Sequence, residues 1–184
     1  MLATLDKLDL RRSTLVIFTN DNGGEWLSHG GPLFHHKGSV WEGGIRVPAM
    51  VRWPGRIPAD SVSGQVGLTM DLTASILAAA GASVPAEARL DGINLFPVLE
   101  GKAKTIERTV FWRVTGARSQ RAVRAGEWKL IFDGRRPLLF NLRTDVGERN
   151  NMIGQRPEIA IRLRSLLDAW QADVDGEAKT AEAR

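Results

Sequence analysis

Two adjacent polar side chains, Asp21 and Asn22, have the types and the position that metal chemistry requires. They follow the apolar run 15–18 after two polar residues, Thr19 and Asn20, and directly precede Gly23 and Gly24. Ligands of open α/β sheets bind at the carboxyl ends of strands, and carboxylate and amide oxygens suit a hard cation such as Ca²⁺ or Mg²⁺. Asp-Asn-Gly clusters are also common in turns. These residues by themselves therefore indicate either a metal site or a plain turn after a strand.

A long glycine-rich loop follows this strand, with seven glycines between residues 22 and 44. The loop also carries these ionisable side chains: His29, His35, His36, Lys37 and Glu42. Long loops in compact domains are usually functional or disordered, so this loop is the second candidate region. Glu42 and Arg46 fit a structural ion pair that folds the loop back. Lys37, taken alone, is equally well explained as an exposed loop lysine.

Composition excludes several classes of chemistry. The 184 residues include no cysteine, which rules out disulfides, thiolate zinc sites and a cysteine nucleophile. The hydrophobic fraction of 43% allows a buried core. The formal net charge is +4, but the basic residues of the second half are dispersed among apolar ones. We therefore expect a solvated basic face or a face that attracts anions, and no nucleic-acid partner.

The order of the expected elements changes near residue 105 of the 184 residues. A short helix and a strand come first and are typical of the end of an α/β unit with a parallel sheet; short strands and a last helix follow. The expected elements are a helix over 3–10, strands over 14–20 and 45–53, a helix over 69–80, strands over 109–115, 120–125, 129–132 and 138–142, and a helix over 157–172. This order predicts three regions: 1–105, 106–172 and a polar tail over 173–184.

Three local expectations accompany this order. Pro48 must lie at an edge or bulge of its strand, because proline cannot donate to a sheet. In the helix over 69–80, Thr69 or Asp71 caps the start, and the apolar face consists of Leu72, Ile76 and Ala79 or Ala80. The last helix has an apolar face that is expected to pack on the antiparallel sheet; its members are Ile159, Leu163, Leu166, Leu167 and Trp170.

Two longer motifs resemble a known family. The segment 14–24 resembles the C-terminal metal-binding strand of the sulfatase family, within the alkaline phosphatase superfamily. Residues 37–48 resemble the family's Lys-Gly-x-x-x-Glu-Gly-Gly-x-Arg-x-Pro signature in order and spacing. Further matching pieces follow in the family's order: 70–73, 90–95, 121–124 with 128–131, and 139–142 ending near Gly147 and Glu148. The resemblance implies the C-terminal part of an alkaline-phosphatase-like α/β sandwich, followed by a small antiparallel sheet packed by a C-terminal helix.

The resemblance also implies a chemistry and roles for named residues. Such enzymes hydrolyse sulfate esters with a divalent metal, Ca²⁺ or alternatively Mg²⁺, and a formylglycine made in a Cys/Ser-x-Pro-x-Arg segment. It implies that Asp21 and Asn22 are metal ligands and that Lys37 contacts the sulfate and supports the nucleophile. His36 is a further candidate for binding substrate; it either does so or orders the loop, and a surface pair with His35 is the alternative. A cation and an ammonium group near the leaving oxygen would stabilise its developing charge.

This sequence departs from the family's pattern before the Asp-Asn strand. It contains no Cys/Ser-x-Pro-x-Arg segment, no N-terminal acidic ligands and no histidine before residue 21. The nearest match, between Ser83 and Arg89, places the arginine two residues too late. We therefore expect the C-terminal portion of a sulfatase, which supplies about half of a metal site and is inactive alone.

Two other functions remain open at this point. A phosphodiesterase or phosphonate hydrolase of the same superfamily would share the metal strand. A non-catalytic module that pairs with an N-terminal sulfatase half, or with its own copies, would share the fold. The first ten residues carry charges among their apolar positions, unlike a signal peptide, and no apolar run reaches the ~18 residues of a membrane span. Family members are often exported, so the sequence leaves the localisation open.

Overall fold

The structure of the chain is a computed structural model that describes residues 1–85, 87–116 and 119–182. Its contacts divide the chain into two compact units. The first unit consists of residues 1–21 and 48–106, and the second consists of residues 22–47 and those from 107 onward. The glycine-rich loop therefore packs with the C-terminal part of the chain. The division of the sequence at residues 105 and 172 stays a prediction.

The first unit contains a pair of strands and three helices. The strands are β1 (Val16–Thr19) and β2 (Ala49–Arg52), and the helices are α1 (Leu2–Lys7), α3 (Thr69–Ala79) and α4 (Phe96–Leu99). β1 and β2 pair antiparallel, with Val16 opposite Arg52 and Thr19 opposite Ala49. The connection between β1 and β2 contains no helix long enough to return the chain to the same end of the sheet, which a parallel pair requires.

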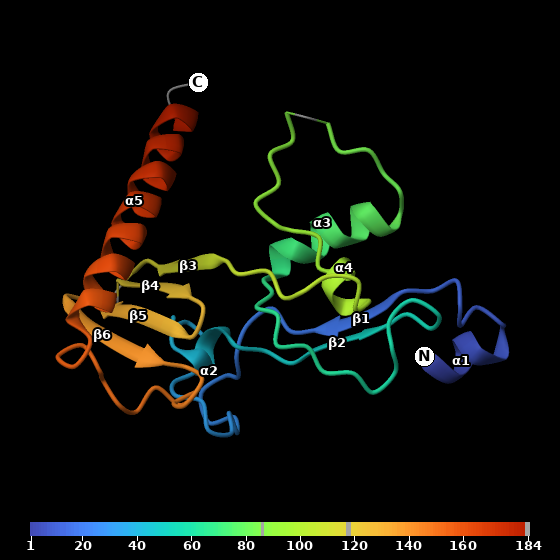
Figure 1. Cartoon of the computed structure of the whole chain (residues 1–184), viewed down its shortest axis with the longest axis horizontal. Helices are drawn as coiled ribbons and strands as arrows, with labels where there is room; N and C mark the ends of the chain where they lie inside the picture. The colour runs from blue at the N-terminus through green and yellow to red at the C-terminus, as the bar shows by residue number, and fades with distance from the viewer. Residues whose placement is uncertain (86, 117–118, 183–184) are drawn as a thin grey trace. The chain divides into compact units, whose positions relative to one another are not determined.

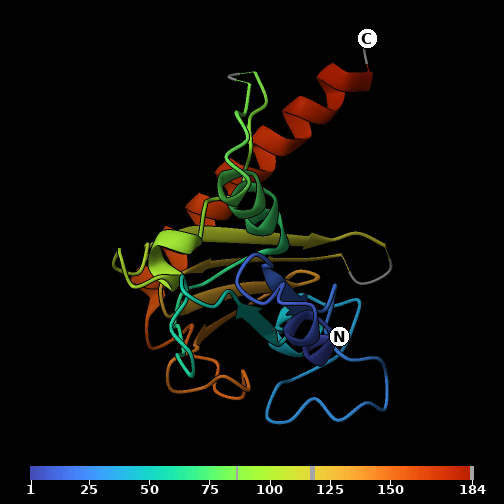
Figure 2. The ribbon, with the colours of Figure 1, turned by 90° about the vertical axis from the view of Figure 1, so that its right-hand side faces the viewer.

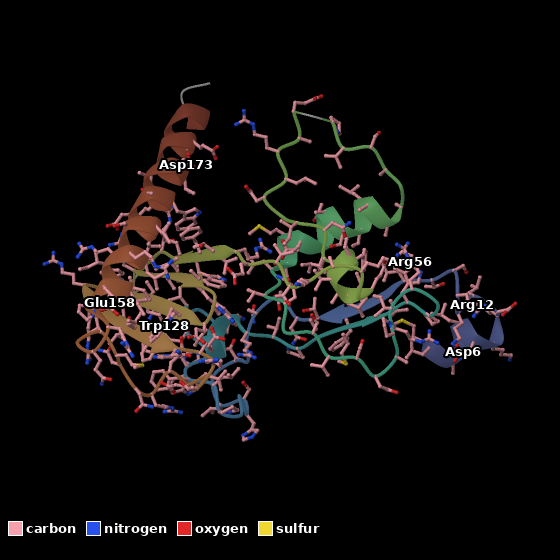
Figure 3. The ribbon with its side chains drawn as sticks, viewed as in Figure 1. Asp6, Arg12, Arg56, Trp128, Glu158 and Asp173 are labelled. Atoms are coloured by element: carbon pink, nitrogen blue, oxygen red, sulfur yellow. The ribbon has the colours of Figure 1, made fainter. Side chains whose placement is uncertain are left out.

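Two contacts fix the ends of this strand pair. Pro48 directly precedes β2, as a residue without an N–H must, and its carbonyl accepts a hydrogen bond from Thr19 Oγ1 at 3.1 Å. Arg52 Nη2 donates to Asp6 Oδ1 at 3.0 Å, which attaches α1 to the end of β2. Asp6 is labelled on α1 in Figure 3.

Helix α3 buries polar side chains where the sequence predicted apolar ones. Asp71 is fully buried, and its two oxygens accept hydrogen bonds from the backbone N–H groups of Leu68 at 2.6 Å and Ile93 at 2.9 Å. One turn later Ser75 Oγ accepts from the N–H of Leu95 at 2.9 Å. The bond to Leu68 confirms Asp71 as a cap. The predicted apolar face is wrong, since Ile76 is 47% exposed; the segment 93–95 needs hydrogen-bond acceptors, and the polar side of α3 supplies them.

The second unit is built on a four-stranded antiparallel sheet in the order β3-β4-β5-β6 (Figure 1). The strands are β3 (Thr109–Val114), β4 (Gln120–Ala125), β5 (Trp128–Asp133) and β6 (Arg136–Asn141). Two-residue turns connect the last three strands, and Gly126 and Gly134 occupy them with φ of 58° and 59°. Positive φ at the first turn residue is what such hairpins require. The predicted antiparallel sheet is confirmed, with strand ends within two residues of the expected ones.

Both faces of this sheet are covered. On one face Val123, Leu130 and Leu139 pack with Leu163 and Leu167 of α5 (Pro157–Glu182). In Figures 1 and 2 helix α5 begins against the sheet and its C-terminal part extends beyond the strands, and Figure 3 labels Glu158 in its first turn and Trp128 on β5. The predicted packing of this helix is confirmed. The helix continues to Glu182, ten residues past the expected end, where an ion pair between Asp175 and Arg113 of β3 supports it.

The opposite face is covered by the glycine-rich loop and its short helix α2 (Glu42–Ile45). Val40 and Trp41 pack against Ile131 and Phe140 of the sheet, and all four side chains are at most 5% exposed. Trp41 is thus a packing residue. Among the described helices, none combines the length and the apolarity needed to cross a bilayer.

The contact between α5 and the sheet should dominate the stability of the second unit. Leu163 is completely buried, whereas Ile161 on the same helix is 67% exposed. We expect Leu163→Ala to lower the free energy of unfolding by about 2–5 kcal/mol through lost packing. Ile161→Ala is the matched control and should change it by no more than about 0.5 kcal/mol. Urea unfolding followed by circular dichroism measures both; equal losses would contradict the packing described above.

Candidate active-site loop

Backbone hydrogen bonds fold the loop over 22–47 into one compact piece. The N–H of Gly23 donates to the carbonyl of Gly44 at 2.9 Å, and the N–H of Lys37 donates to that of Gly24 at 2.8 Å. The N–H of Gly43 donates to the carbonyl of Phe34 at 2.8 Å. These bonds bring the beginning, the middle and the end of the loop side by side. The residues of the Asn-Gly-Gly turn and of the lysine segment therefore keep fixed positions relative to each other.

Glycine is required at the points where these segments of the loop meet. A Cβ atom on Gly23 would lie 1.8 Å from the carbonyl oxygen of Gly43, and one on Gly43 would lie 2.2 Å from that of His35. Both distances are far below van der Waals contact with backbone atoms that cannot move aside. The glycines of this motif therefore serve close backbone approach and not merely flexibility.

Asn22 and Asp21 differ in their environments. The Asn22 side chain is half-buried, and its Nδ2 donates to the carbonyl of Gly23 at 2.8 Å, which orients the amide group. Asp21 is exposed and is the last residue of the first unit before the loop begins. Oxygen donors from an acid and an amide fit a hard divalent cation. Within the described ranges no group of three or more His, Cys, Asp or Glu side chains gathers around a common point, so these two residues are at most a partial ligand set.

Lys37 lies beside an acidic residue that the sequence had not indicated. Its Nζ is 3.2 Å from Glu25 Oε2, and about half of its side chain is exposed. The N–H of Trp26 donates to the other carboxylate oxygen at 2.9 Å. This backbone bond first, and then the Lys37 ammonium, lower the pKa of Glu25. Glu25 is therefore ionised at neutral pH and faces Lys37 as its counter-charge.

His36 supports the backbone next to Lys37. Its Nδ1 lies 2.9 Å from the carbonyl oxygen of Lys37, and its ring meets the edge of Trp26 with the centroids 4.7 Å apart. His35 instead stacks on Trp41, with ring centroids 5.6 Å apart and an interplanar angle of 28°. Both histidines are half-buried, so they do not form an exposed surface pair. Of the two roles expected for His36, these contacts favour the one that orders the loop.

A buried charge cluster joins the loop to the sheet. Lys129 of β5 is completely buried, and its Nζ lies 2.7 Å from Glu42 Oε1 and 2.9 Å from Glu148 Oε1. The second oxygen of Glu148 accepts from the backbone N–H of Glu42 at 2.6 Å. Burial raises the pKa of Glu148, and the nearby Lys129 opposes that shift. Arg46 Nη1 lies 3.4 Å from the remaining oxygen of Glu42, which confirms the expected pair between these two residues.

Sequence reasoning missed Lys129 and Glu148. The signal for Lys129 was present, because period-two alternation places it on the same face as the buried Ile131. A charged side chain on an inward face requires a buried partner. Glu148 ends one of the pieces that resemble the family, but no local pattern relates it to Glu42, which lies 106 residues away.

Alanine at Gly43 tests whether the loop needs the close approach described above. We expect Gly43→Ala to loosen the loop, because its Cβ would overlap the carbonyl oxygens of Phe34 and His35. Gly30→Ala is the matched control in the same loop, since its Cβ would have no neighbour nearer than 3.9 Å. Limited proteolysis should cut the Gly43 variant within the loop at least about tenfold faster than the control. Equal rates would show that the glycine at this position is dispensable.

Comparisons with known proteins identify the family that this chain resembles. The family model for sulfatases matches residues 1–82. The chain is 32% identical to steryl-sulfatase of Mus musculus over its whole length and 34% identical to arylsulfatase A of Bos taurus over 87% of it. It spans 35% and 37% of these two relatives.

Solved structures agree with the sequence relatives. Ps i-CgsB is 27% identical with a TM-score of 0.85, and the match covers 91% of this chain and 38% of that one. The sulfatase PsFucS1 from Pseudoalteromonas sp. is 25% identical with a TM-score of 0.77, and the match covers 93% and 39%. The fold is thus that of the alkaline phosphatase-like sulfatases, as predicted. The chain belongs to the sulfatase family and corresponds to a C-terminal portion of its members.

Proposed function

We propose that this chain carries the C-terminal share of the active site of a sulfate-ester hydrolase. In this proposal Asp21 and Asn22 bind a divalent cation, Ca²⁺ or alternatively Mg²⁺, and Lys37 binds the sulfate group of the substrate. The observation that carries the proposal is the bonding of the loop. The hydrogen bond from Lys37 N–H to the Gly24 carbonyl holds the lysine segment against the turn that begins at Asn22.

Lys37 would act by exchanging one anion for another. The carboxylate of its partner Glu25 is held by an exposed ion pair at 3.2 Å and by one backbone bond. Exposed pairs of this kind contribute little to stability, so a sulfate group can replace the carboxylate at small cost. The His36 ring, at 2.9 Å from the Lys37 carbonyl, holds the backbone in place during that exchange.

The proposed metal ligands fit a hard cation but do not complete its coordination. Ca²⁺ takes about six to eight oxygen ligands, and this chain offers the Asp21 carboxylate and the Asn22 amide. When bound, the cation would supply positive charge beside the sulfate oxygens. The family resemblance implies that the remaining acidic ligands and the formylglycine nucleophile come from residues outside this chain. We therefore propose that the chain alone does not turn over sulfate esters.

Activity of the chain alone and in combination tests this proposal. We expect no metal-dependent release of sulfate when the purified chain meets p-nitrophenyl sulfate and Ca²⁺. Co-production with the part of arylsulfatase A that this chain does not match should restore Ca²⁺-dependent release. In that mixture Lys37→Met should lower kcat/KM by about 100- to 1000-fold, the usual effect of removing one charge-stabilising donor.

Lys104→Met is the control, because Lys104 is exposed and lies outside the loop. Sulfate release by the chain alone would contradict the shared-site proposal, and equal activity of the two lysine variants would contradict the role of Lys37. Faster hydrolysis of bis(p-nitrophenyl) phosphate than of the sulfate ester would favour the phosphodiesterase alternative.

Metal binding can be followed separately with Tb³⁺, whose luminescence is sensitised by nearby tryptophan. We expect Asp21→Ala to weaken Tb³⁺ binding by at least about tenfold, because it removes the only carboxylate of the proposed pair. Asp91→Ala is the control, since Asp91 is also exposed and lies in the same unit. An unchanged affinity in the Asp21 variant would exclude Asp21 as a ligand.

A further inference from the structure

We propose that Lys129 and Glu148 are positioning residues for the active-site loop: the buried cluster of Glu42, Lys129 and Glu148 holds α2, and α2 holds Asn22 and Lys37 in place. The role assigned to the loop rests on the function proposed above. The positioning itself is a statement about this chain and can be tested without substrate or metal.

The first step is the attachment of α2 to the sheet. Glu42 opens α2 and contacts the cluster twice, through its carboxylate to Lys129 at 2.7 Å and through its backbone N–H to Glu148 Oε2 at 2.6 Å. Two contacts from different parts of one residue fix both its position and its orientation. Lys129 is in turn fixed in the middle layer of the unit, on β5, with its ammonium 5.8 Å from the ring centroid of Trp112.

The backbone around Glu148 also restricts the position of this residue. Its backbone has φ of 54°, a left-handed conformation that is uncommon for a residue with a side chain. The preceding Gly147 packs so close to the loop that a Cβ there would lie 2.7 Å from the carbonyl oxygen of Pro32. The segment that carries Glu148 therefore approaches the loop at two neighbouring residues, and its conformation costs energy that the buried contacts must offset.

The second step is transmission from α2 to the proposed site residues. Within α2, the N–H of Gly43 donates to Phe34, which lies three residues before Lys37, and the carbonyl of Gly44 accepts from Gly23, which follows Asn22. Both bonds are 2.8–2.9 Å long. A shift of Glu42 would therefore move the acceptor and the donor that hold both ends of the site.

The buried charges and the apolar contacts hold different parts of the loop. Val40 and Trp41 anchor the middle of the loop to Ile131 and Phe140 through apolar contact, and the N–H of Val40 donates to Gln120 Oε1 of β4 at 3.2 Å. Loss of the cluster should thus leave the loop on the sheet but release α2. Removing Lys129 leaves two buried carboxylates. Arg46 and Arg124 both remain near Glu42, but Glu148 loses its ion-pair partner, and breaking a buried pair on one side leaves a charge without compensation. The loop would then move to let water reach that charge.

Hydrogen exchange of the full chain, followed amide by amide, tests this proposal. In Lys129→Met the amides of Gly23, Lys37 and Gly43 should exchange at least about tenfold faster than in the wild type, while those of β4 and α5 change less than about twofold. Leu163→Ala is the matched control: it weakens the opposite face of the sheet and should speed exchange in α5 without singling out the loop.

A rescue variant shows whether charge balance is the cause. Lys129→Met combined with Glu148→Gln leaves Glu42 paired with Arg46 and keeps an oxygen for the Glu42 N–H. We expect this double variant to return loop exchange to within about threefold of the wild type, because neutral replacements of buried ion pairs are often tolerated. Glu42→Gln keeps Lys129 paired with Glu148, so it should fold, and it should still loosen the loop.

Three outcomes would overturn the proposal: uniform acceleration of all amides in Lys129→Met, unchanged loop exchange in that variant, or no recovery in the double variant. Uniform acceleration would mean that the cluster serves only overall stability. The Tb³⁺ titration of the Asp21 variant decides the metal proposal independently, so failure of one experiment does not imply failure of the other.

Discussion

The position of the glycine-rich loop on the sheet of the second unit depends on one buried positive charge. Lys129 lies on a strand between two apolar layers, and it is compensated by two glutamates that come from distant parts of the sequence. An unpaired ammonium in this environment would be costly, so the strand, the loop and the segment at Glu148 must all be in place together. The cluster therefore selects one arrangement of the loop on the sheet, which apolar contact by Trp41 and Val40 would specify less sharply.

Glycine complements this charge by allowing the loop to fold upon itself. The carbonyl and N–H groups of Gly23, Gly43 and Gly44 contact other parts of the loop at distances that exclude a Cβ. A loop with so many glycines has too few side chains to form a core of its own. It becomes ordered because its backbone hydrogen bonds are satisfied internally, and because its few large side chains, Phe34, Val40 and Trp41, use the core of the sheet.

Much of this architecture could be predicted from local patterns. Short strand-like runs in the second half of the sequence located the antiparallel sheet, and the apolar stripe with Leu163 and Leu167 located its covering helix. The spacing of Lys37, Glu42 and Arg46 with the glycines located the candidate site. Contacts over long sequence separations could not be predicted: nothing local relates Glu148 to Glu42, or Glu25 to Lys37. The direction in which β1 and β2 pair could not be predicted either, because a buried strand sequence does not reveal the direction of its partner.

Helix α3 shows a further kind of order that periodicity alone does not reveal. Its acceptors, Asp71 and Ser75, are four residues apart, about 6 Å along a helix axis. They accept hydrogen bonds from the N–H groups of Ile93 and Leu95. These two residues are two apart in the sequence, which corresponds to about 6.6 Å in an extended chain. The spacing of the two acceptors therefore matches the spacing of the two N–H groups. Helix α3 accepts hydrogen bonds from the segment 93–95 at both positions, as the edge of a neighbouring strand would. Helix α3 thereby sets the register of that segment. A shift of the segment by one residue would place opposite both acceptors the residues whose N–H groups point the other way.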